Sequence, residues 1–189
     1  DIQLTFNQPI DRASLEKNFI LADSNEARVP GKFTWSDDST QVTFHHAIPF
    51  ARETAYLLRL DGGTRSAGGT PLGKDISRSY RTVGSLRVIA TNPERGKPIV
   101  VYGGGYGSIE LRFSQPLTKG DLSRWFEIQP KPGDFAVYQG GEESSAFISG
   151  FFEPSTSYQL IINPRITDRW GGAISGETNL NFFTGPAIP

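Results

Sequence analysis

The chain has 189 residues and a formal net charge of −1, which argues against a nucleic-acid partner or an anionic membrane surface, since both need a basic surface. It contains no cysteine, which excludes a disulfide framework, a zinc–thiolate site and a cysteine nucleophile. The 21 glycines and 13 prolines indicate many turns, as short strands joined by tight connections require. No apolar run is long enough to span a bilayer, so direct membrane insertion is not expected.

The first half of the chain predicts short strands and one helical turn. Ile2, Leu4 and Phe6 alternate with polar residues, which indicates a strand with one buried face. Leu15 and Phe19 stand four residues apart and predict a short helical turn. The further elements expected are a hairpin over residues 32–45, a strand from Thr54 through Leu60, a glycine-rich loop reaching Gly73 and a last strand over residues 76–83.

The second half begins with a segment that the first half lacks. Residues 86–91 predict a strand, residues 98–102 an extended stretch, and residues 103–107 a flexible loop or bulge. A strand is then expected over residues 108–114. Because the first half has no counterpart to residues 85–107, we expect its leading strand to be missing, and upstream residues to fill an otherwise open sheet edge. The absence of methionine and the start in mid-strand favour a fragment of a longer protein.

One module is used twice in this chain. Residues 1–21 read DIQLTFNQPIDRASLEKNFIL, and residues 108–128 read SIELRFSQPLTKGDLSRWFEI, which aligns Phe6 with Phe113. The ends of the two halves also match, with Tyr56 aligned with Tyr158. Tandem copies of a small module are typical of spacers, binding arrays and large surface proteins, and seldom of enzymes.

The pattern predicts an all-β chain of two tandem immunoglobulin-like β-sandwich domains, over residues 1–84 and 85–189. Short strands, frequent turn signals and a tyrosine that leads a late strand are typical of that fold. Tyr56 and Tyr158 are predicted to hydrogen-bond a nearby backbone group. Phe6 and Phe113 are predicted to be structural residues at the ends of equivalent strands.

Two glycine-rich segments resemble nucleotide-binding loops. Residues 68–75 mimic a phosphate-binding loop, but Asp75 stands where Ser or Thr is needed, and a strand is expected to follow. Residues 103–107 fall short of a dinucleotide fingerprint, because Ser108 replaces the last glycine and a strand follows. A loop that closes a sandwich is the favoured interpretation of the first, and no cofactor is expected.

The acidic and histidine pairs favour turns and solvated strand ends over chemistry. Adjacent residues on a strand point to opposite faces, so His45 and His46 cannot easily share one metal. Two acidic pairs fall in expected hairpin turns, at residues 37–38 and 142–143, and lack the spacing of a calcium loop. We therefore predict no catalytic, cofactor-binding or metal-binding residue. The bends at Asp61 and Asp168 are the positions to test for calcium.

The three tryptophans offer the remaining surface candidates. Trp35 alternates with Phe33 and is expected in the core. Trp125 precedes Phe126 and is expected to face away from the packed side, and Trp170 lies in a loop. Trp125 and Trp170 are therefore the candidates for contact with a neighbouring domain or a ligand, including a sugar on which an aromatic face stacks.

Each half resembles the bacterial Ig-like domains of surface, S-layer-type and large secreted proteins. The resemblance rests on the strand that ends in Phe-x-Gln-Pro, the helical turn, the Thr-x-Tyr strand and the Phe/Tyr-x-Thr ending. Residues 88–96, with the turn Asn92-Pro93-Glu94-Arg95-Gly96, also fit the opening of that module. The resemblance concerns the fold and implies no activity.

The second half also resembles the first macroglobulin-like domain of bacterial alpha-2-macroglobulins, through residues 109–128 and the strand around residues 155–163. This resemblance implies a non-enzymatic scaffold or spacer in a periplasmic, membrane-anchored or cell-surface protease trap. Its partners would be the neighbouring domains of the parent chain and, through the parent, proteases. The trap's thioester needs a cysteine that this chain lacks. The alternative is an Ig-like array of an adhesin, an S-layer or a carbohydrate-associated protein.

Overall fold

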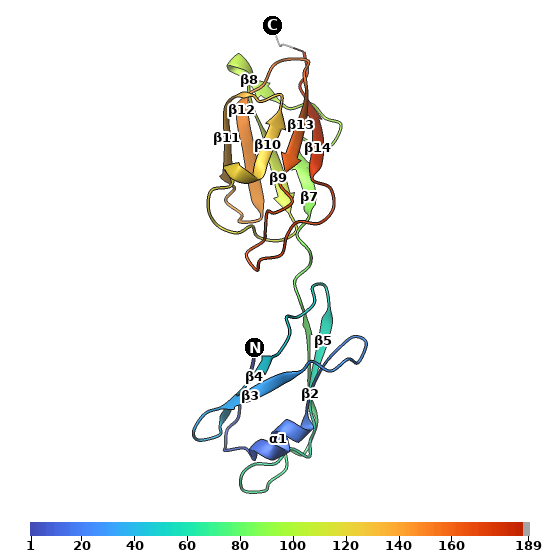
Figure 1. The fold of residues 1–189 in the computed structure, drawn as a ribbon, viewed down its shortest axis with the longest axis vertical. Coiled ribbons are helices and arrows are strands. Elements are labelled where there is room, and N and C mark those ends of the chain that lie inside the picture. The colour runs from blue at the N-terminus through green and yellow to red at the C-terminus, as the bar shows by residue number, and fades with distance from the viewer. Residues whose placement is uncertain (187–189) are drawn as a thin grey trace. The chain divides into compact units, whose positions relative to one another are not determined.

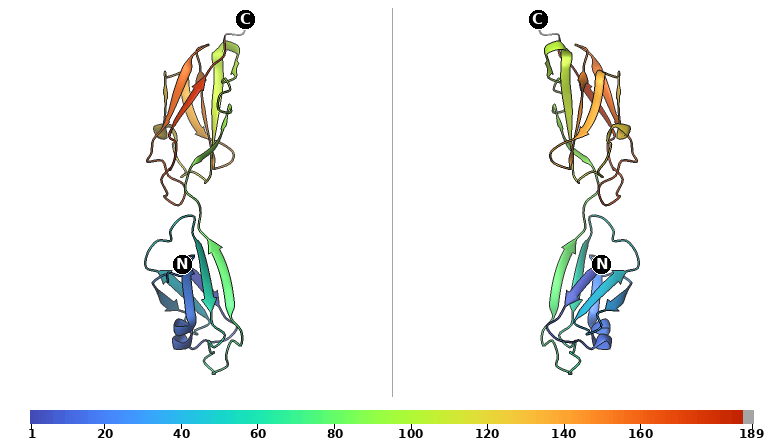
Figure 2. Two further views of the ribbon diagram at one scale, coloured as in Figure 1. Left: turned by 90° about the vertical axis from the view of Figure 1, so that its right-hand side faces the viewer. Right: turned by 90° about the vertical axis from the view of Figure 1, so that its left-hand side faces the viewer.

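The computed structural model describes residues 1–186 and divides after Val83 into two compact units. Both units are built almost entirely from antiparallel strands (Figure 1). Side views show two layers of strands in each unit (Figure 2). Each unit has its own hydrophobic core, drawn from residues 10–60 in the first unit and 86–182 in the second. Both units are therefore immunoglobulin-like β-sandwiches.

The first unit contains six strands and one helix within the described residues. They are β1 (Ile2–Thr5), α1 (Arg12–Asn18), β2 (Phe19–Asp23), β3 (Gly31–Trp35), β4 (Gln41–His46), β5 (Ala55–Leu60) and β6 (Ile76–Arg81). One sheet has the order β1-β4-β3 and the other the order β2-β5-β6. The helix begins where the Asp11 carboxylate accepts the Ser14 backbone N–H, and its Leu15 is buried in the core.

The second unit, described through residue 186, contains eight strands and two short 3₁₀ turns. They are β7 (Val88–Asn92), β8 (Val101–Tyr102), η1 (Gly103–Gly105), β9 (Tyr106–Phe113), η2 (Ser123–Trp125), β10 (Phe126–Gln129), β11 (Gly133–Gln139), β12 (Ser145–Phe151), β13 (Ser157–Ile162) and β14 (Asn179–Phe183). One sheet has the order β11-β12-β9-β7, with β8 also pairing β9. The other has the order β10-β13-β14.

The expected repeat appears as equivalent strands in equivalent registers. Ile2 of β1 faces Phe44 of β4, and Ile109 of β9 faces Ile148 of β12. The alternation that predicted these strands places Ile109 and Leu111 in the core, with both side chains fully buried. Strand β9 also pairs β7 and β8, whereas β1 is the edge strand of its sheet among the described residues.

The segment before β9 forms less β-strand than the sequence predicts, because part of it crosses from one sheet toward the other. Of the expected extended stretch 98–102, only Val101 and Tyr102 pair with β9. Ile99 instead forms a parallel bridge to Thr184, next to the opposite sheet. The expected flexible loop at residues 103–107 is a 3₁₀ turn, and β9 starts at Tyr106 because the positive φ angles of Gly104 and Gly105 complete that turn early.

Candidate functional site

Each unit closes with a corner made by a tyrosine and a threonine. The Tyr56 hydroxyl accepts the Ala51 backbone N–H at 3.0 Å, and the Tyr158 hydroxyl accepts the Glu153 backbone N–H at 2.7 Å. Beside Tyr158, the buried Thr184 hydroxyl accepts the backbone N–H of Thr156 at 3.0 Å. It also donates to the Glu153 carbonyl at 2.5 Å. The corners thus use the tyrosines for structure, as the sequence predicts.

Thr82 repeats the role of Thr184 in the first unit. Its hydroxyl accepts the Thr54 backbone N–H at 3.0 Å and donates to the Ala51 carbonyl at 2.6 Å. Phe113 is buried in the second core, and its counterpart Phe6 packs half-buried against the first. These residues form the frame of the two units and carry no chemistry of their own.

The two predicted contact tryptophans differ in exposure. Trp170 is 53% exposed, and the Arg169 guanidinium lies 5.9 Å from its ring centroid. Trp125 is half-buried and packs against the second core, with the Arg124 guanidinium 4.6 Å from its ring centroid. A shallow groove of about 470 Å³ runs beside it, between Arg124 and Pro164. Of these two tryptophans, Trp170 is therefore the more exposed.

The paired carboxylates are engaged in turns. Asp38 lies between β3 and β4, and it accepts hydrogen bonds from the Ser36 hydroxyl at 2.6 Å and from the Thr40 backbone N–H and hydroxyl. The Ser36 hydroxyl and the Thr40 groups hold the pKa of Asp38 below its usual value. In the second pair, Glu143 forms ion pairs with Lys119 and Arg169. Both pairs act as turn and surface groups.

The bends at Asp61 and Asp168 direct their carboxylates at their own loops. Asp61 accepts the Gly63 backbone N–H at 2.8 Å. Asp168 is fully buried and accepts the backbone N–H groups of Trp170 and Gly172, both at 2.9 Å. Such Asx geometry stabilises a turn. Within residues 1–186, no three His, Cys, Asp or Glu side chains gather in a way that could hold a metal ion.

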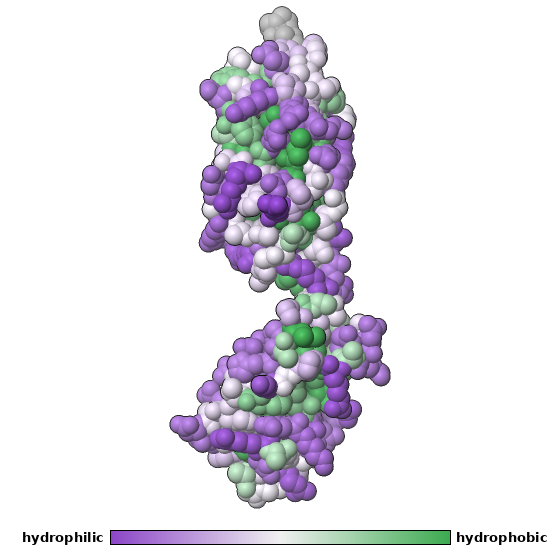
Figure 3. Space-filling view, viewed as in Figure 1, coloured by the Kyte–Doolittle hydropathy of each residue, from purple (hydrophilic) through white to green (hydrophobic). Residues whose placement is uncertain are grey.

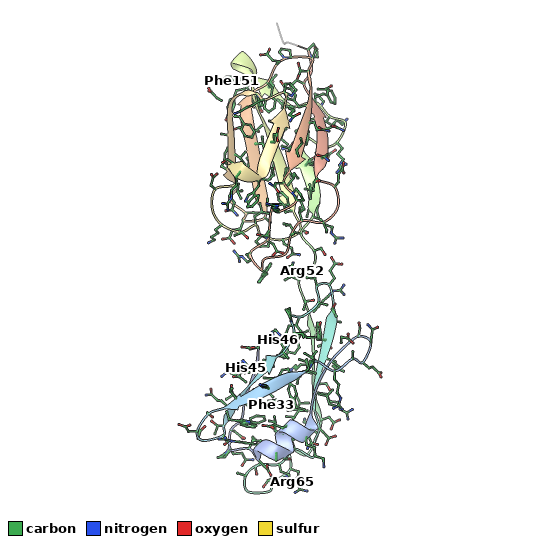
Figure 4. The ribbon with its side chains drawn as sticks, viewed as in Figure 1. Phe33, His45, His46, Arg52, Arg65 and Phe151 are labelled. Atoms are coloured by element: carbon green, nitrogen blue, oxygen red, sulfur yellow. The ribbon has the colours of Figure 1, made fainter. Side chains whose placement is uncertain are left out.

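The two histidines contact different partners. His45 contacts the Asp1 carboxylate at 2.9 Å and the Thr34 hydroxyl at 2.8 Å. His46 contacts the Ile48 carbonyl at 2.7 Å, and its ring packs 4.3 Å from that of Phe50. Figure 4 labels both side chains on β4. Their different partners follow from the strand period, which turns adjacent side chains to opposite faces.

The phosphate-loop mimic at residues 68–75 leads into strand β6, and a phosphate site needs a helix there. Asp75 accepts the Gly62 backbone N–H at 2.9 Å and pairs with Arg59 at 2.5 Å. Those two contacts, the amide first, hold the pKa of Asp75 below its usual value. The segment is a loop that closes the first sandwich.

A groove that the sequence patterns do not single out opens between the two sheets of the first unit. It encloses about 330 Å³ and lies at the edge where β1 and β6 face each other. Its lining includes Ile2, Leu21, Phe50, Tyr56 and Tyr80.

The outer surface shown in Figure 3 is mostly polar, with small hydrophobic patches on both units. Exposed aromatic side chains gather near η1 in the second unit, where the rings of Tyr106 and Phe151 lie 5.5 Å apart. Figure 4 labels Phe151 at that end. Among the described residues, no helix has the length and hydropathy that crossing a bilayer requires.

Comparison with known proteins gives a family match for the first unit. A family model described as a bacterial Ig-like domain matches residues 1–82, and no curated protein matches the chain. Two similar solved structures are a crystal structure of native alpha-2-macroglobulin from Escherichia coli spanning domains MG0-NIE-MG1 and a cryo-EM reconstruction of the native conformation of E. coli alpha-2-macroglobulin. Each is 11% identical with a TM-score of 0.36 and covers 96% of this chain. The match spans 66% of the first structure's chain and 13% of the second's. The first unit of this chain, residues 1–82, is therefore similar to bacterial Ig-like domains.

Proposed function

We propose that residues 1–189 are a non-catalytic structural segment of a larger extracytoplasmic bacterial protein. The observation that carries this proposal is that carboxylate and hydroxyl side chains form hydrogen bonds with nearby backbone and turn groups. The carboxylates at Asp38, Asp61 and Asp168 accept hydrogen bonds from their own turns, and the corner hydroxyls of Tyr56 and Tyr158 bind backbone amides. Side chains used in this way hold loops in place and stabilise the fold.

We further propose that the parent is a protease trap of the alpha-2-macroglobulin type. The support is the sequence resemblance of residues 109–128 and 155–163 to the first macroglobulin-like domain of such proteins. In that reading the two units act by position, as a spacer from the anchor or as part of the shell. The partners are the neighbouring domains of the parent and, through the parent, proteases.

Determining the complete parent reading frame tests the trap. A Cys-x-Glu-Gln segment downstream of residue 189, in a long chain with macroglobulin-like domains, is the expected finding. Treating the parent with a small amine should then release one thiol, because an amine cleaves a thioester to an amide and a free thiol. A parent made only of further Ig-like copies would contradict the trap.

The second candidate function is a ligand-binding array of an adhesin, an S-layer or a carbohydrate-associated protein. Its support is Trp170, whose exposed ring could stack on a sugar face. A glycan array probed with the chain, with the Trp170→Ala variant as the comparison, tests it. Glycan binding that the variant loses would favour the array and would count against a pure spacer.

A further inference from the structure

The leading segment of the second unit seals the space between its two sheets. Leu86 and Ile99 are both buried in the core of that unit. The Ile99 backbone N–H donates to the Phe183 carbonyl at 2.7 Å, and Ile99 forms a parallel bridge to Thr184 of the β14 end. The same segment supplies β7 and β8, which cover the edge of β9. One stretch of chain therefore closes both the edge and the gap.

The place that Ile99 occupies has a counterpart in the first unit. Phe50 packs 4.7 Å from Tyr56, as Phe152 packs 5.0 Å from Tyr158. The corner bonds of Thr82 repeat those of Thr184, which fixes the alignment of the two units at this point. The residues equivalent to Phe183 and Thr184 are thus Arg81 and Thr82. Both line the groove of about 330 Å³ described above.

Apolar side chains around that groove are less covered than their counterparts. Tyr80 is 46% exposed, whereas Phe182 is 4% exposed. Ile2 is half-buried where Ile109 is fully buried. Phe50 is likewise half-buried where Phe152 is buried. The differences are confined to the side that residues 85–107 cover in the second unit.

The neighbouring edge is open in the same region. Among residues 1–186, β1 pairs with β4 alone, whereas β9 pairs with β12, β7 and β8. In the second unit Thr91 faces Leu111 and Asn92 faces Glu110. The equivalent positions on β1 are Leu4 and Gln3. An unpaired edge beside an apolar groove accepts an extended strand with one anchoring side chain.

We infer that the groove of the first unit is a docking site for an extended peptide segment with the chemistry of residues 86–101 of this chain. Its strand pairs with Gln3–Thr5 of β1. An aliphatic side chain enters the groove between Ile2, Phe50 and Tyr80, and its N–H donates to the Arg81 carbonyl, as Ile99 does to Phe183. The chemistry required is that of residues 86–101, and the inference is independent of the protease-trap proposal.

The test fuses a copy of residues 85–107 directly ahead of Asp1 of the full chain, because that segment runs directly into the repeat at residue 108. The melting temperature of the first unit should rise by roughly 10 °C, since the copies of Leu86 and Ile99 become buried in a domain of this size. Hydrogen exchange at the backbone amides of Gln3–Thr5 should slow, and the Tyr80 ring should become less accessible to a fluorescence quencher.

The matched control carries the same extension with the copy of Ile99 replaced by Asp, which puts a charge where the apolar anchor belongs. It should lose most of the rise in melting temperature and the protection of β1. An extension that changes neither the melting temperature nor the exchange would overturn the inference, as would an equal effect from the Asp control.

Discussion

At the scale of single residues, the corner threonines connect sequence to stability most directly. Thr184→Val removes a hydroxyl that accepts the Thr156 backbone N–H and donates to the Glu153 carbonyl. Because both backbone groups then lose a partner near the core, the free energy of unfolding of the second unit should fall by about 1–3 kcal/mol. Urea unfolding followed by tryptophan fluorescence measures it. Thr82→Val is the matched variant and should weaken the first unit alone, and an effect on the other unit would contradict the assignment.

The turn at Asp38 gives a prediction about pH. Hydrogen bonds from Ser36 and Thr40 lower the pKa of Asp38 in the folded state. The stabilisation is therefore fully present above the unfolded pKa of about 3.9, and it is lost as the pH falls through the lower folded pKa. A carboxyl NMR titration should place the Asp38 pKa below the usual value, and Ser36→Ala should raise it. An unchanged pKa in Ser36→Ala would show that the hydroxyl is not the main cause.

Asp121 offers an independent check of the same physics. It accepts the hydroxyl and backbone N–H of Ser123, and these contacts hold its pKa below the usual value. Its carboxylate precedes the η2 turn, as Asp11 precedes α1. The two acids are not equivalent in the repeat, because Asp121 aligns with Ser14 and Asp11 aligns with Thr118.

At the scale of elements, the leading segment of the second unit is the sharpest case. Ile99→Ala deletes a side chain that is buried in the second core, at the point where the backbone bridges to Thr184. The second unit should lose about 2–5 kcal/mol of unfolding free energy, because the space left behind is only partly refilled. Val100→Ala is the control: that neighbouring side chain is 61% exposed, and its loss should change stability by less than about 0.5 kcal/mol. Chemical denaturation measures both losses. Equal losses of unfolding free energy in the two variants would contradict the buried position of Ile99.

The sequence predicts strands well where one face is apolar and poorly where the chain crosses between sheets. The alternation at Ile109 and Leu111 marks β9 because only a strand puts alternate residues on one face. The crossing at Ile99 has no such period, since a single side chain enters the core there. The tyrosine corners were predictable from the repeated Thr-x-Tyr pattern. The groove was not, because its walls come from β1, β2, β5, β6 and the loop before β5, and these segments are far apart in sequence.

The exposure of the two candidate surface tryptophans was also predicted only in part. Trp170 was predicted to lie free in a loop and is exposed, because the Asp168 carboxylate ties that loop through backbone bonds and leaves the indole outside. Trp125 was predicted to face away from the packed side, and it instead packs half-buried against the core. The difference follows from the 3₁₀ turn at η2, which ends the strand alternation that the prediction assumed.

At the scale of the whole molecule, two separate cores predict two unfolding events. The first core cluster has nine buried hydrophobic residues among the described positions and the second has eighteen, so the first unit should melt at the lower temperature. Calorimetry of the full chain measures this. Leu58→Ala should lower only the first transition and Leu160→Ala only the second, because each side chain is buried in one core. A single transition that moves with both variants would contradict independent units.

The same organisation gives the structural proposal its physical basis. Each unit buries its own core and ties its loops with its own polar side chains, so that neither needs a bound ligand to complete its turns. The exception is the groove beside β1, where apolar side chains lack the cover that their counterparts have. Under the proposed function, such a module would serve the parent protein by the surfaces and the distance that it provides.

The most direct test of the account is protease capture by the parent protein. The parent is mixed with an endoprotease and separated under native conditions, and the protease is followed by its activity on a small substrate. Under the proposed function, the protease should elute with the parent after cleavage, and Trp170→Ala should leave capture unchanged, because a structural role does not use the exposed ring. Protease that elutes free of an intact parent, or capture abolished by Trp170→Ala without loss of stability, would contradict it.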